Sequence, residues 1–321
     1  MKIQGVKLSV VFMTVALAAF ALLHAVPAHS YLPQGSATGG VFVPLHWQST
    51  PIPIEISTNT TGAKLQGSVS FQTTIQNSLA SWNLAPNFQS PLGSVTTSNT
   101  QTPDGSNLIC FCTSGAVFNQ NDGTLALTIT TFSGSQITAA SIFFNPNPSG
   151  VCFVTDNSAC TNGTDFAQDL QTVATHELGH FIGLDHSAVV RATMYPFAPA
   201  KETQLSWDDV AGASLLYPKP AADVATGGIS GTVSLTGAVF GAHVYANPEG
   251  SNDPFGAFSI RKTPIGMLTD LSGNYTITGL PSDNYEVLAE PLDGPVLNGN
   301  VEWAPDFGVG SVQTGFTTRF F

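Results

Sequence analysis

Between residues 41 and 144, short apolar runs alternate with turn-forming residues. Residues 52–57 (IPIEIS) alternate strictly, 123–132 (GTLALTITTF) are rich in β-branched residues, and 137–145 (ITAASIFFN) end before a loop of Pro and Asn. Patterns of this kind predict strands. Residues 68–83, by contrast, place apolar side chains at helical spacing, which predicts one helix among the strands.

A longer helix is predicted over residues 164–183, with Asp165 as the residue that caps its first turn. Its apolar stripe, at the spacing of a buried helix face, consists of Leu170, Ala174, Leu178 and Phe181. A further helix is expected over residues 206–218, because Ser206 can cap its start and Pro218 can stop it. The first part of the chain, residues 31–219, is therefore expected to be α+β.

The pattern changes after residues 220–227, which combine Pro, Ala and Gly and predict a linker. From residue 228 to residue 321, evenly spaced strand-like segments alternate with Gly and Asn turns. This spacing predicts a second, all-β domain, a small antiparallel sandwich.

The N-terminal residues 1–30 combine two lysines, an apolar run from Leu8 to Leu23, and small residues around Ala28. This order is typical of a secretory signal peptide. The alternative is a membrane anchor, since the apolar run is about as long as a short membrane span. We favour a cleaved signal, and therefore an exported protein.

Composition narrows the class of protein. Only 9% of the residues are charged, against roughly 25% in typical soluble domains. The formal net charge is -12 and no run of Lys or Arg occurs, so nucleic acid is not an expected partner. No segment after the signal is long and apolar enough to cross a bilayer, so no membrane association is expected of the mature chain.

The four cysteines of an exported chain are expected to form disulfides. Cys110 and Cys112 are two residues apart in a predicted strand, where a bond between them would be strained. Two alternatives stay open: both pair with Cys152 and Cys160, or Cys152 and Cys160 form a single bridge. The spacing of the first pair does not match a zinc knuckle.

The candidate chemistry lies in residues 176–186, HELGHFIGLDH. His176 and His180 are four residues apart on a predicted helix, so both imidazoles can reach one ion. Gly183 can adopt the positive φ that ends a helix, and the reversed chain would bring His186 to the same point. Three neutral nitrogens with a fourth position open to water form the catalytic arrangement of zinc, not the structural one.

Glu177 lies beside His176 and is not needed as a ligand. In this geometry it could take a proton from the water at the metal as that water attacks a peptide carbonyl, and then deliver it to the leaving amine. Zinc would lower the pKa of the water to roughly 7 and polarise the carbonyl. We therefore expect Glu177 to be the general base.

The same stretch resembles the H-E-x-x-H-x-x-G-x-x-H motif of the metzincin zinc peptidases. Met194, in ATMYP, matches their methionine turn, and LSWDDVAGASLLYP resembles the end of the matrixin, or matrix metalloproteinase-like, domain. This resemblance covers roughly residues 47–217. It implies a zincin fold with a twisted sheet, a methionine that supports the histidines without binding metal, and an edge strand near Leu125 and Ala126 that binds substrate antiparallel.

The chain departs from the matrixin pattern in three ways. No PRCG motif lies between the signal and Trp47, so latency by a cysteine switch is not expected. The histidine and aspartate cluster of the matrixins' second zinc is missing, so we expect one Zn²⁺; the sequence is compatible with Ca²⁺ but marks no ligands for it. Matrixins shape a substrate pocket with Pro-x-Tyr, whereas this chain has Pro196, Phe197 and Ala198, which leaves specificity open.

Three acidic residues receive structural interpretations. Asp185 either bonds near a ligand histidine or faces solvent, and we favour solvent. Asp208 and Asp209 are expected at the start of the helix over residues 206–218, where acids suit the first turn, and should tether the chain there.

The C-terminal segments GGISGTVSLTG and DLSGNYTITGLPSDNYEV resemble the carboxypeptidase-regulatory-like, transthyretin-type β-sandwich. SGN predicts a tight turn and YTI a half-buried strand. No catalytic cluster is visible in this part of the chain. Substrate binding, surface binding and a role as a spacer are all compatible with it.

The favoured function is a secreted zinc metalloendopeptidase, a monomer that cleaves protein or peptide substrates outside the cell, at its surface or in a periplasm. A second hypothesis is an exported binding or adhesion protein that keeps the zincin scaffold without turnover, but the intact Glu177 argues against it. A third, a zinc enzyme that acts on a non-peptide bond, is disfavoured by the matrixin-like surroundings.

Overall fold

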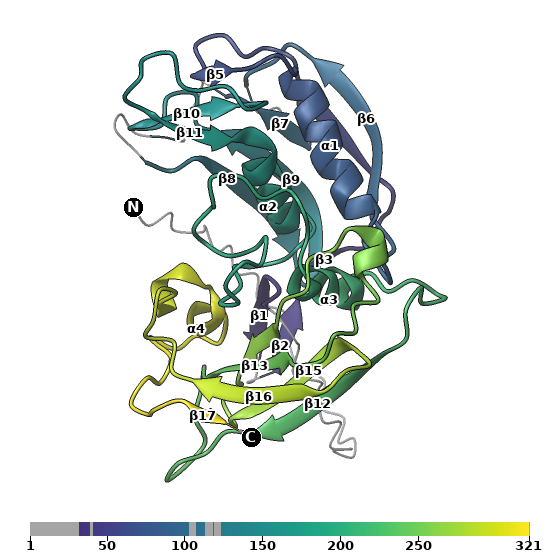
Figure 1. Cartoon of the computed structure of the whole chain (residues 1–321), viewed down its shortest axis with the longest axis vertical. Helices are drawn as coiled ribbons and strands as arrows, with labels where there is room; N and C mark the ends of the chain where they lie inside the picture. The colour runs from purple at the N-terminus through teal and green to yellow at the C-terminus, as the bar shows by residue number, and fades with distance from the viewer. Residues whose placement is uncertain (1–31, 39–40, 103–106, 113–117, 119–122, 321) are drawn as a thin grey trace, which may run out of the picture.

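The computed structural model describes residues 32–38, 41–102, 107–112, 118 and 123–320, so the predicted signal peptide lies outside the described residues. The first part of the chain is built on a sheet with the strand order β3-β9-β7-β4-β6, in which β8 pairs antiparallel with β9 (Figure 1). Its strands are β3 (His46–Trp47), β4 (Ile52–Ser57), β6 (Leu92–Ser98), β7 (Leu108–Cys110), β8 (Ala126–Ser133) and β9 (Gln136–Phe144).

The predicted strands are confirmed, and the alternation of their side chains explains why the helices pack on one face of the sheet. In β4, alternate residues Ile52, Ile54 and Ile56 are fully buried. One face of a strand points toward the helices because successive side chains alternate. Apart from β9, no strand of the described chain pairs with β8, so β8 is an edge strand, as the family resemblance implied.

Helix α1 (Phe71–Asn83) is confirmed, and it lies beside α2 (Leu170–Phe181) on the sheet (Figure 1). The Trp82 indole donates a hydrogen bond of 2.9 Å to the carbonyl of Thr175, which joins the two helices. The predicted apolar stripe of α2 is confirmed, since Leu170, Ala174, Leu178 and Phe181 are each at most 1% exposed.

The predicted start of α2 at Asp165 is wrong. The residues that follow Asp165 form strand β11 (Phe166–Asp169), which pairs parallel with β10 (Val151–Val154); β10 also pairs with β5 (Leu65–Gln66). Asp169 caps the helix instead, with its carboxylate accepting from the Thr172 amide at 2.8 Å. The ladder with β10 keeps this segment extended, and Asp165 forms an ion pair with Lys64.

Two disulfides join neighbouring cysteines in the described chain, Cys110 to Cys112 and Cys152 to Cys160. The second bridge is one of the predicted alternatives, whereas the prediction that Cys110 and Cys112 avoid each other is wrong. Strand β7 ends at Cys110, so the chain can turn and bring the two Cα atoms to 5.2 Å, within the usual range for a disulfide.

Helix α3 (Trp207–Leu216) begins at the predicted cap, Ser206, and connects the two halves of the molecule. It packs against β14 (Ile265–Leu268) and β15 (Asn274–Pro281) of the C-terminal region. The approach is close: a side chain at Gly279 would lie 2.8 Å from the Cβ of Ala211. The apolar core is continuous from the first sheet through Trp207 to Ile265 and Ile277.

The C-terminal region consists of two antiparallel sheets. One pairs β12 (Thr226–Thr232) with β15, and the other has the order β14-β13-β16-β17, with β13 (His243–Pro248), β16 (Tyr285–Glu290) and β17 (Arg319–Phe320). The predicted tight turn before β15 is confirmed by Gly273 at φ +75. Strand β12 begins within the predicted linker, and the linker itself is held by Asn87, whose amide and carbonyl groups bond to Val224 at 2.8 and 2.9 Å.

A hairpin of β1 (Gly35–Thr38) and β2 (Val41–Pro44) packs against a short helix, α4 (Trp303–Asp306). The Phe42 ring of the hairpin packs at a tilt against Trp303, with the ring centroids 4.9 Å apart. The 3₁₀ turns are η1 (Gly256–Phe258) and η2 (Asn298–Asn300). The chain segment that follows β16 therefore lies against the segment that precedes β3.

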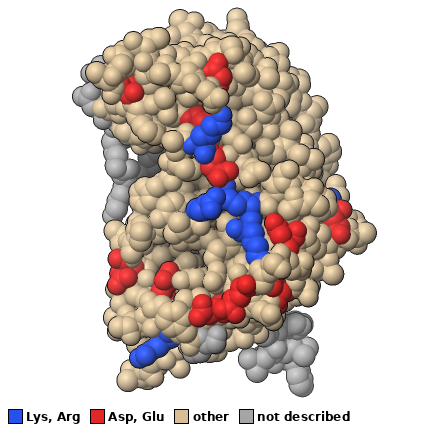
Figure 2. All heavy atoms as spheres, in the orientation of Figure 1, with Lys and Arg blue, Asp and Glu red and all other residues tan. Residues whose placement is uncertain are grey.

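Charged side chains are sparse on the surface. On the face in Figure 2, most of the basic groups gather in the middle with acidic groups around them. Arg191 and Arg261 share Glu202, and Lys262 pairs with Asp283 at 2.7 Å. In the part of the chain that the structure describes, no helix has the length and apolar character of a membrane span.

Candidate metal centre and cleft

Helix α2 presents two histidines on the side away from its apolar stripe. His176 Nδ1 donates to the carbonyl of Thr193 at 2.7 Å, and His180 Nδ1 donates to the carbonyl of Leu184 at 2.8 Å. Because a carbonyl can only accept, each Nδ1 carries the proton and each Nε2 keeps a free lone pair. The helix thus holds both rings ready to bind a cation.

Gly183 turns the chain back toward these rings, as predicted. Its φ is +105, and a Cβ there would lie 2.5 Å from the carbonyl oxygen of Leu45, so both conformation and space require glycine. Beyond it, His186 Nε2 comes within 3.3 Å of His180 Nε2. The loop is held by two backbone bonds to the N-terminal segment, from Gln34 to Gly183 at 2.8 Å and from Asp185 to Leu32 at 2.7 Å.

The three histidines form a group whose ligand atoms all lie within 4.8 Å of one another. Two nitrogens bound to a tetrahedral zinc at 2.0–2.1 Å lie roughly 3.3 Å apart, which matches the spacing of His180 and His186. Burial lowers the pKa of His176 to about 3, helped by the charge of His186, and burial also lowers the pKa of the other two imidazoles. Neutral imidazoles are the form that zinc binds, so the donor set fits this metal.

Glu177 lies next to the first ligand and is only 6% exposed. The hydroxyl of Thr128, on the edge strand β8, donates to its Oε2 at 2.6 Å. Burial raises the pKa of Glu177 to about 7, while the hydrogen bonds from Thr128 oppose the rise. Sequence reasoning missed Thr128, because its partner lies 49 residues away.

Met194, in the segment that follows His186, is 2% exposed. Its sulfur packs on α2 at Gly179, where an added side chain would collide with it. Both its amide and that of Thr193 donate to the carboxylate of Asp209, at 3.0 and 2.8 Å. Asp209 also closes the capping box with Ser206 at the start of α3, so the predicted tethering role of Asp209 is confirmed.

Asp208 also tethers the chain, by accepting from the Ser187 hydroxyl at 2.6 Å and from the Gly266 amide at 2.9 Å. The prediction that Asp185 faces solvent is wrong, since Asp185 is 6% exposed. Its two carboxylate oxygens accept from the amides of His186 and Glu302, at 2.7 and 2.8 Å.

The histidines and Glu177 lie in a cleft of about 850 Å³. The predicted substrate residues come together here, because its walls include Leu125, Ala126, Pro196 and Phe197. The C-terminal region adds a wall that sequence reasoning missed, formed by Gly299, Asn300, Glu302 and Asp306. No sequence motif marks these four residues. A contribution made by a backbone carbonyl cannot be recognised from the residue type.

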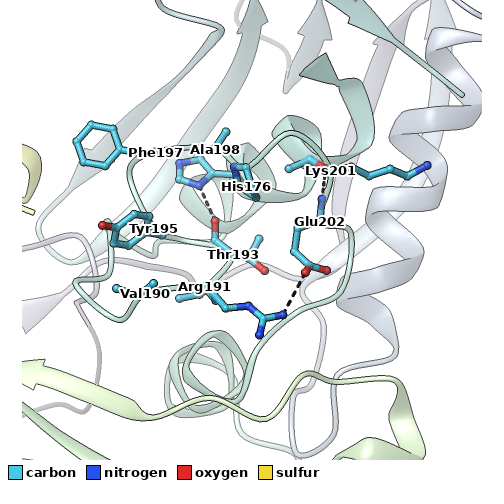
Figure 3. A pocket seen from close by; sticks show the side chains of 12 residues that line it. His176, Val190, Arg191, Thr193, Tyr195, Phe197, Ala198, Lys201 and Glu202 are labelled. Atoms are coloured by element: carbon cyan, nitrogen blue, oxygen red, sulfur yellow. Dashed lines mark hydrogen bonds and ion pairs between the residues drawn. The ribbon is translucent and has the colours of Figure 1, made fainter. Parts of the chain in front are cut away.

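A smaller pocket of about 230 Å³ opens beside His176 (Figure 3). Tyr195, Phe197 and Pro199 contribute apolar surface, while Arg191 and Glu202 form an ion pair with a nitrogen–oxygen distance of 3.9 Å. The pocket is therefore mostly apolar, with a charge pair in its lining.

This arrangement is that of a zinc site with three histidine ligands. The family model described as Matrixin matches residues 117–218, and the three histidines that form the zinc-binding triad lie within this match. Strand β8, α2, the methionine segment and α3 all fall within the match.

Several known metalloproteinases are similar to short stretches of this chain. Metalloendoproteinase 1-MMP of Arabidopsis thaliana is 50% identical over 60 residues, 18% of this chain and 16% of that protein. Matrilysin of Rattus norvegicus is 44% identical over 62 residues, 18% of this chain and 23% of its own length. Karilysin of Tannerella forsythia is 36% identical over 94 residues, 28% of this chain and 20% of that protein. The chain thus spans less than a quarter of each relative.

Proposed function

We propose that this protein is a zinc metalloendopeptidase that hydrolyses peptide bonds in extended polypeptides. The observation that carries the proposal is the convergence of three imidazole Nε2 atoms beside the buried Glu177, at the floor of an open cleft. The donor set leaves a tetrahedral ion one position for water or substrate. When bound, zinc supplies a lowered pKa for water and polarisation of the scissile carbonyl.

Glu177 is the general base in this proposal. Its carboxylate takes the proton of the attacking water and delivers it to the leaving amine. The hydrogen bond from Thr128 fixes one of its oxygens, so the carboxylate needs little reorganisation during the reaction. Met194 contributes a rigid apolar floor beneath the histidines and takes no part in proton transfer.

An extended substrate would add to the sheet at β8. This strand pairs only with β9 in the described chain, and an unpaired edge offers backbone donors and acceptors to a peptide. Leu125 and Ala126 border the cleft where this strand begins. Pro196 and Phe197 would contact the side chain after the cleaved bond, which the pocket beside His176 could receive.

The proposal includes a location outside the cytosol, because structural disulfides persist in oxidising compartments and the described chain has two. The two antiparallel sheets after residue 226 support a transthyretin-type identity for the C-terminal region. The monomeric state stays a prediction.

The test compares the purified protein with its Glu177→Ala variant on an unfolded protein substrate, with zinc content measured on both. We expect both to hold one zinc, and the variant to lose about 10²- to 10⁴-fold in kcat/KM, the usual contribution of a general base. If both hold zinc and neither cleaves, the peptidase proposal fails in favour of a binding protein. Cleavage of a peptide library would separate a peptidase from an enzyme that acts on other bonds.

A further inference from the structure

Every ligand histidine donates its second nitrogen to a backbone carbonyl, but the three carbonyls come from different parts of the chain. Those of Thr193 and Leu184 lie within the matrixin match, close in sequence to their histidines. The third, that of Asn300, lies 114 residues beyond His186, in the C-terminal region, and accepts from His186 Nδ1 at 2.6 Å. One zinc ligand therefore depends on a segment outside the matched family domain.

The turn that carries this carbonyl, residues 297–302, is held in place from both sides. Within it, the Leu297 amide donates to Asn300 Oδ1 at 2.8 Å. At its end, the Glu302 amide donates to Asp185 at 2.8 Å, while the same carboxylate accepts from the His186 amide. Asp185 thus links the ligand loop directly to the turn. Val301 and Trp303, at 3% and 2% exposure, anchor the end of the turn in the protein interior.

We propose that the turn of residues 297–302 is a positioning element of the zinc site. The Asn300 carbonyl selects the tautomer of His186 that keeps Nε2 free and fixes the plane of its ring. Asp185 is a positioning residue that holds the Asn300 carbonyl and the His186 ring in place relative to each other. The C-terminal region is thus part of the metal centre. This inference uses the zinc site of the proposed function but not its catalytic step.

Glu302 offers a matched pair of variants in the full-length protein. Glu302→Pro removes the amide proton that Asp185 accepts, whereas Glu302→Ala keeps the amide and removes only the carboxylate. The backbone is close to what proline needs, since φ is -88 at Glu302 and the preceding Val301 is extended at φ -130, ψ 149. Competition with a chromogenic chelator would measure zinc affinity; we expect Glu302→Pro to bind zinc about 10- to 100-fold more weakly than Glu302→Ala, as for other losses in the outer shell of a metal site.

Asn300→Ala provides a second variant, needed if the proline variant does not fold. It removes the bond to the Leu297 amide and loosens the carbonyl, so it should weaken zinc binding in the same direction. The second measurement is the increase in unfolding midpoint that zinc produces. A merely structural turn would lower the midpoints of metal-free and zinc-loaded protein equally and leave this increase unchanged.

Equal zinc affinity in Glu302→Pro and Glu302→Ala, or an unchanged zinc-induced midpoint shift in Asn300→Ala, would overturn the inference. Neither readout depends on turnover. A wild-type protein that binds zinc without cleaving peptides would therefore contradict the proposed function and leave this comparison intact.

Discussion

Gly179 lies between the two histidines of α2, at the contact between the helix and Met194. An added methyl group would collide with the Met194 sulfur and lie 3.1 Å from the Trp82 ring. In a free helix the change to alanine would stabilise by about 1 kcal/mol, but overpacking a buried contact costs about 1–3 kcal/mol. We expect Gly179→Ala to lower the free energy of unfolding by up to about 2 kcal/mol, measured by denaturant titration.

A double-mutant cycle with Met194→Ala isolates the cause. Once the methionine side chain is removed, only the 3.1 Å contact with Trp82 remains, so Gly179→Ala should then cost much less. The same penalty in both backgrounds would show that Met194 is not the obstacle.

At the residue scale, what could be predicted is what is local in sequence. His176, His180 and Gly183 follow from helix geometry alone. Asp185 could not be placed, because one of its hydrogen-bond partners, Glu302, lies 117 residues away. Periodicity carries no information about a contact of that separation.

At the scale of elements, the start of α3 supports the methionine segment. The Asp209 carboxylate accepts from three amides, those of Ser206, Thr193 and Met194. Losing a helix cap costs about 1 kcal/mol, and each buried donor left without a partner costs about 1–3 kcal/mol. We expect Asp209→Ala to destabilise the protein by about 3 kcal/mol or more, measured by denaturant titration, and to weaken zinc binding, since Thr193 orients His176.

Ser206→Ala is the matched control. It removes the other half of the capping box but leaves the two bonds to the methionine segment, so it should cost only about 1 kcal/mol and leave zinc affinity nearly unchanged. Equal effects of the two variants would reduce Asp209 to an ordinary helix cap.

The elements that sequence patterns predicted well are those with one buried face, such as β4, α1 and α3. The start of α2 was predicted too early because the pattern at residues 165–169 suits a first helical turn, whereas pairing with β10 makes most of this segment a strand. Tertiary pairing overrides local propensity in such a case. The disulfide between Cys110 and Cys112 was predicted wrongly for a related reason. The residue at which β7 ends depends on the strands that pair with it, which the local sequence does not show.

On the scale of the whole molecule, burial at the contact between the two halves creates a pH dependence. Burial, together with the charges of Asp185 and Glu302, raises the pKa of Asp306 to about 8, and its Oδ2 has no hydrogen-bond partner among the described residues. In the unfolded chain the same carboxyl would ionise near pH 4. Between these values the unfolded state releases the proton first, so this group lowers stability as the pH rises.

We therefore expect Asp306→Asn to gain stability relative to wild type as the pH rises from about 4 to about 8. Unfolding midpoints of both metal-free proteins across this range would measure the difference, and the ligand histidines contribute equally to both and cancel. Asp208→Asn should show the same trend up to about pH 7, because burial and the charge of Asp209 raise the pKa of Asp208 to about 7. A difference that stays flat with pH would contradict the assignment.

The core that continues from the first sheet through α3 into β14 and β15 has a consequence for how such a chain can evolve. Exchanging the C-terminal region for an unrelated module would expose the buried face of α3 to solvent. It would also remove the carbonyl that accepts the hydrogen bond from His186. Substitutions at the contact between the two parts are therefore expected to compensate one another.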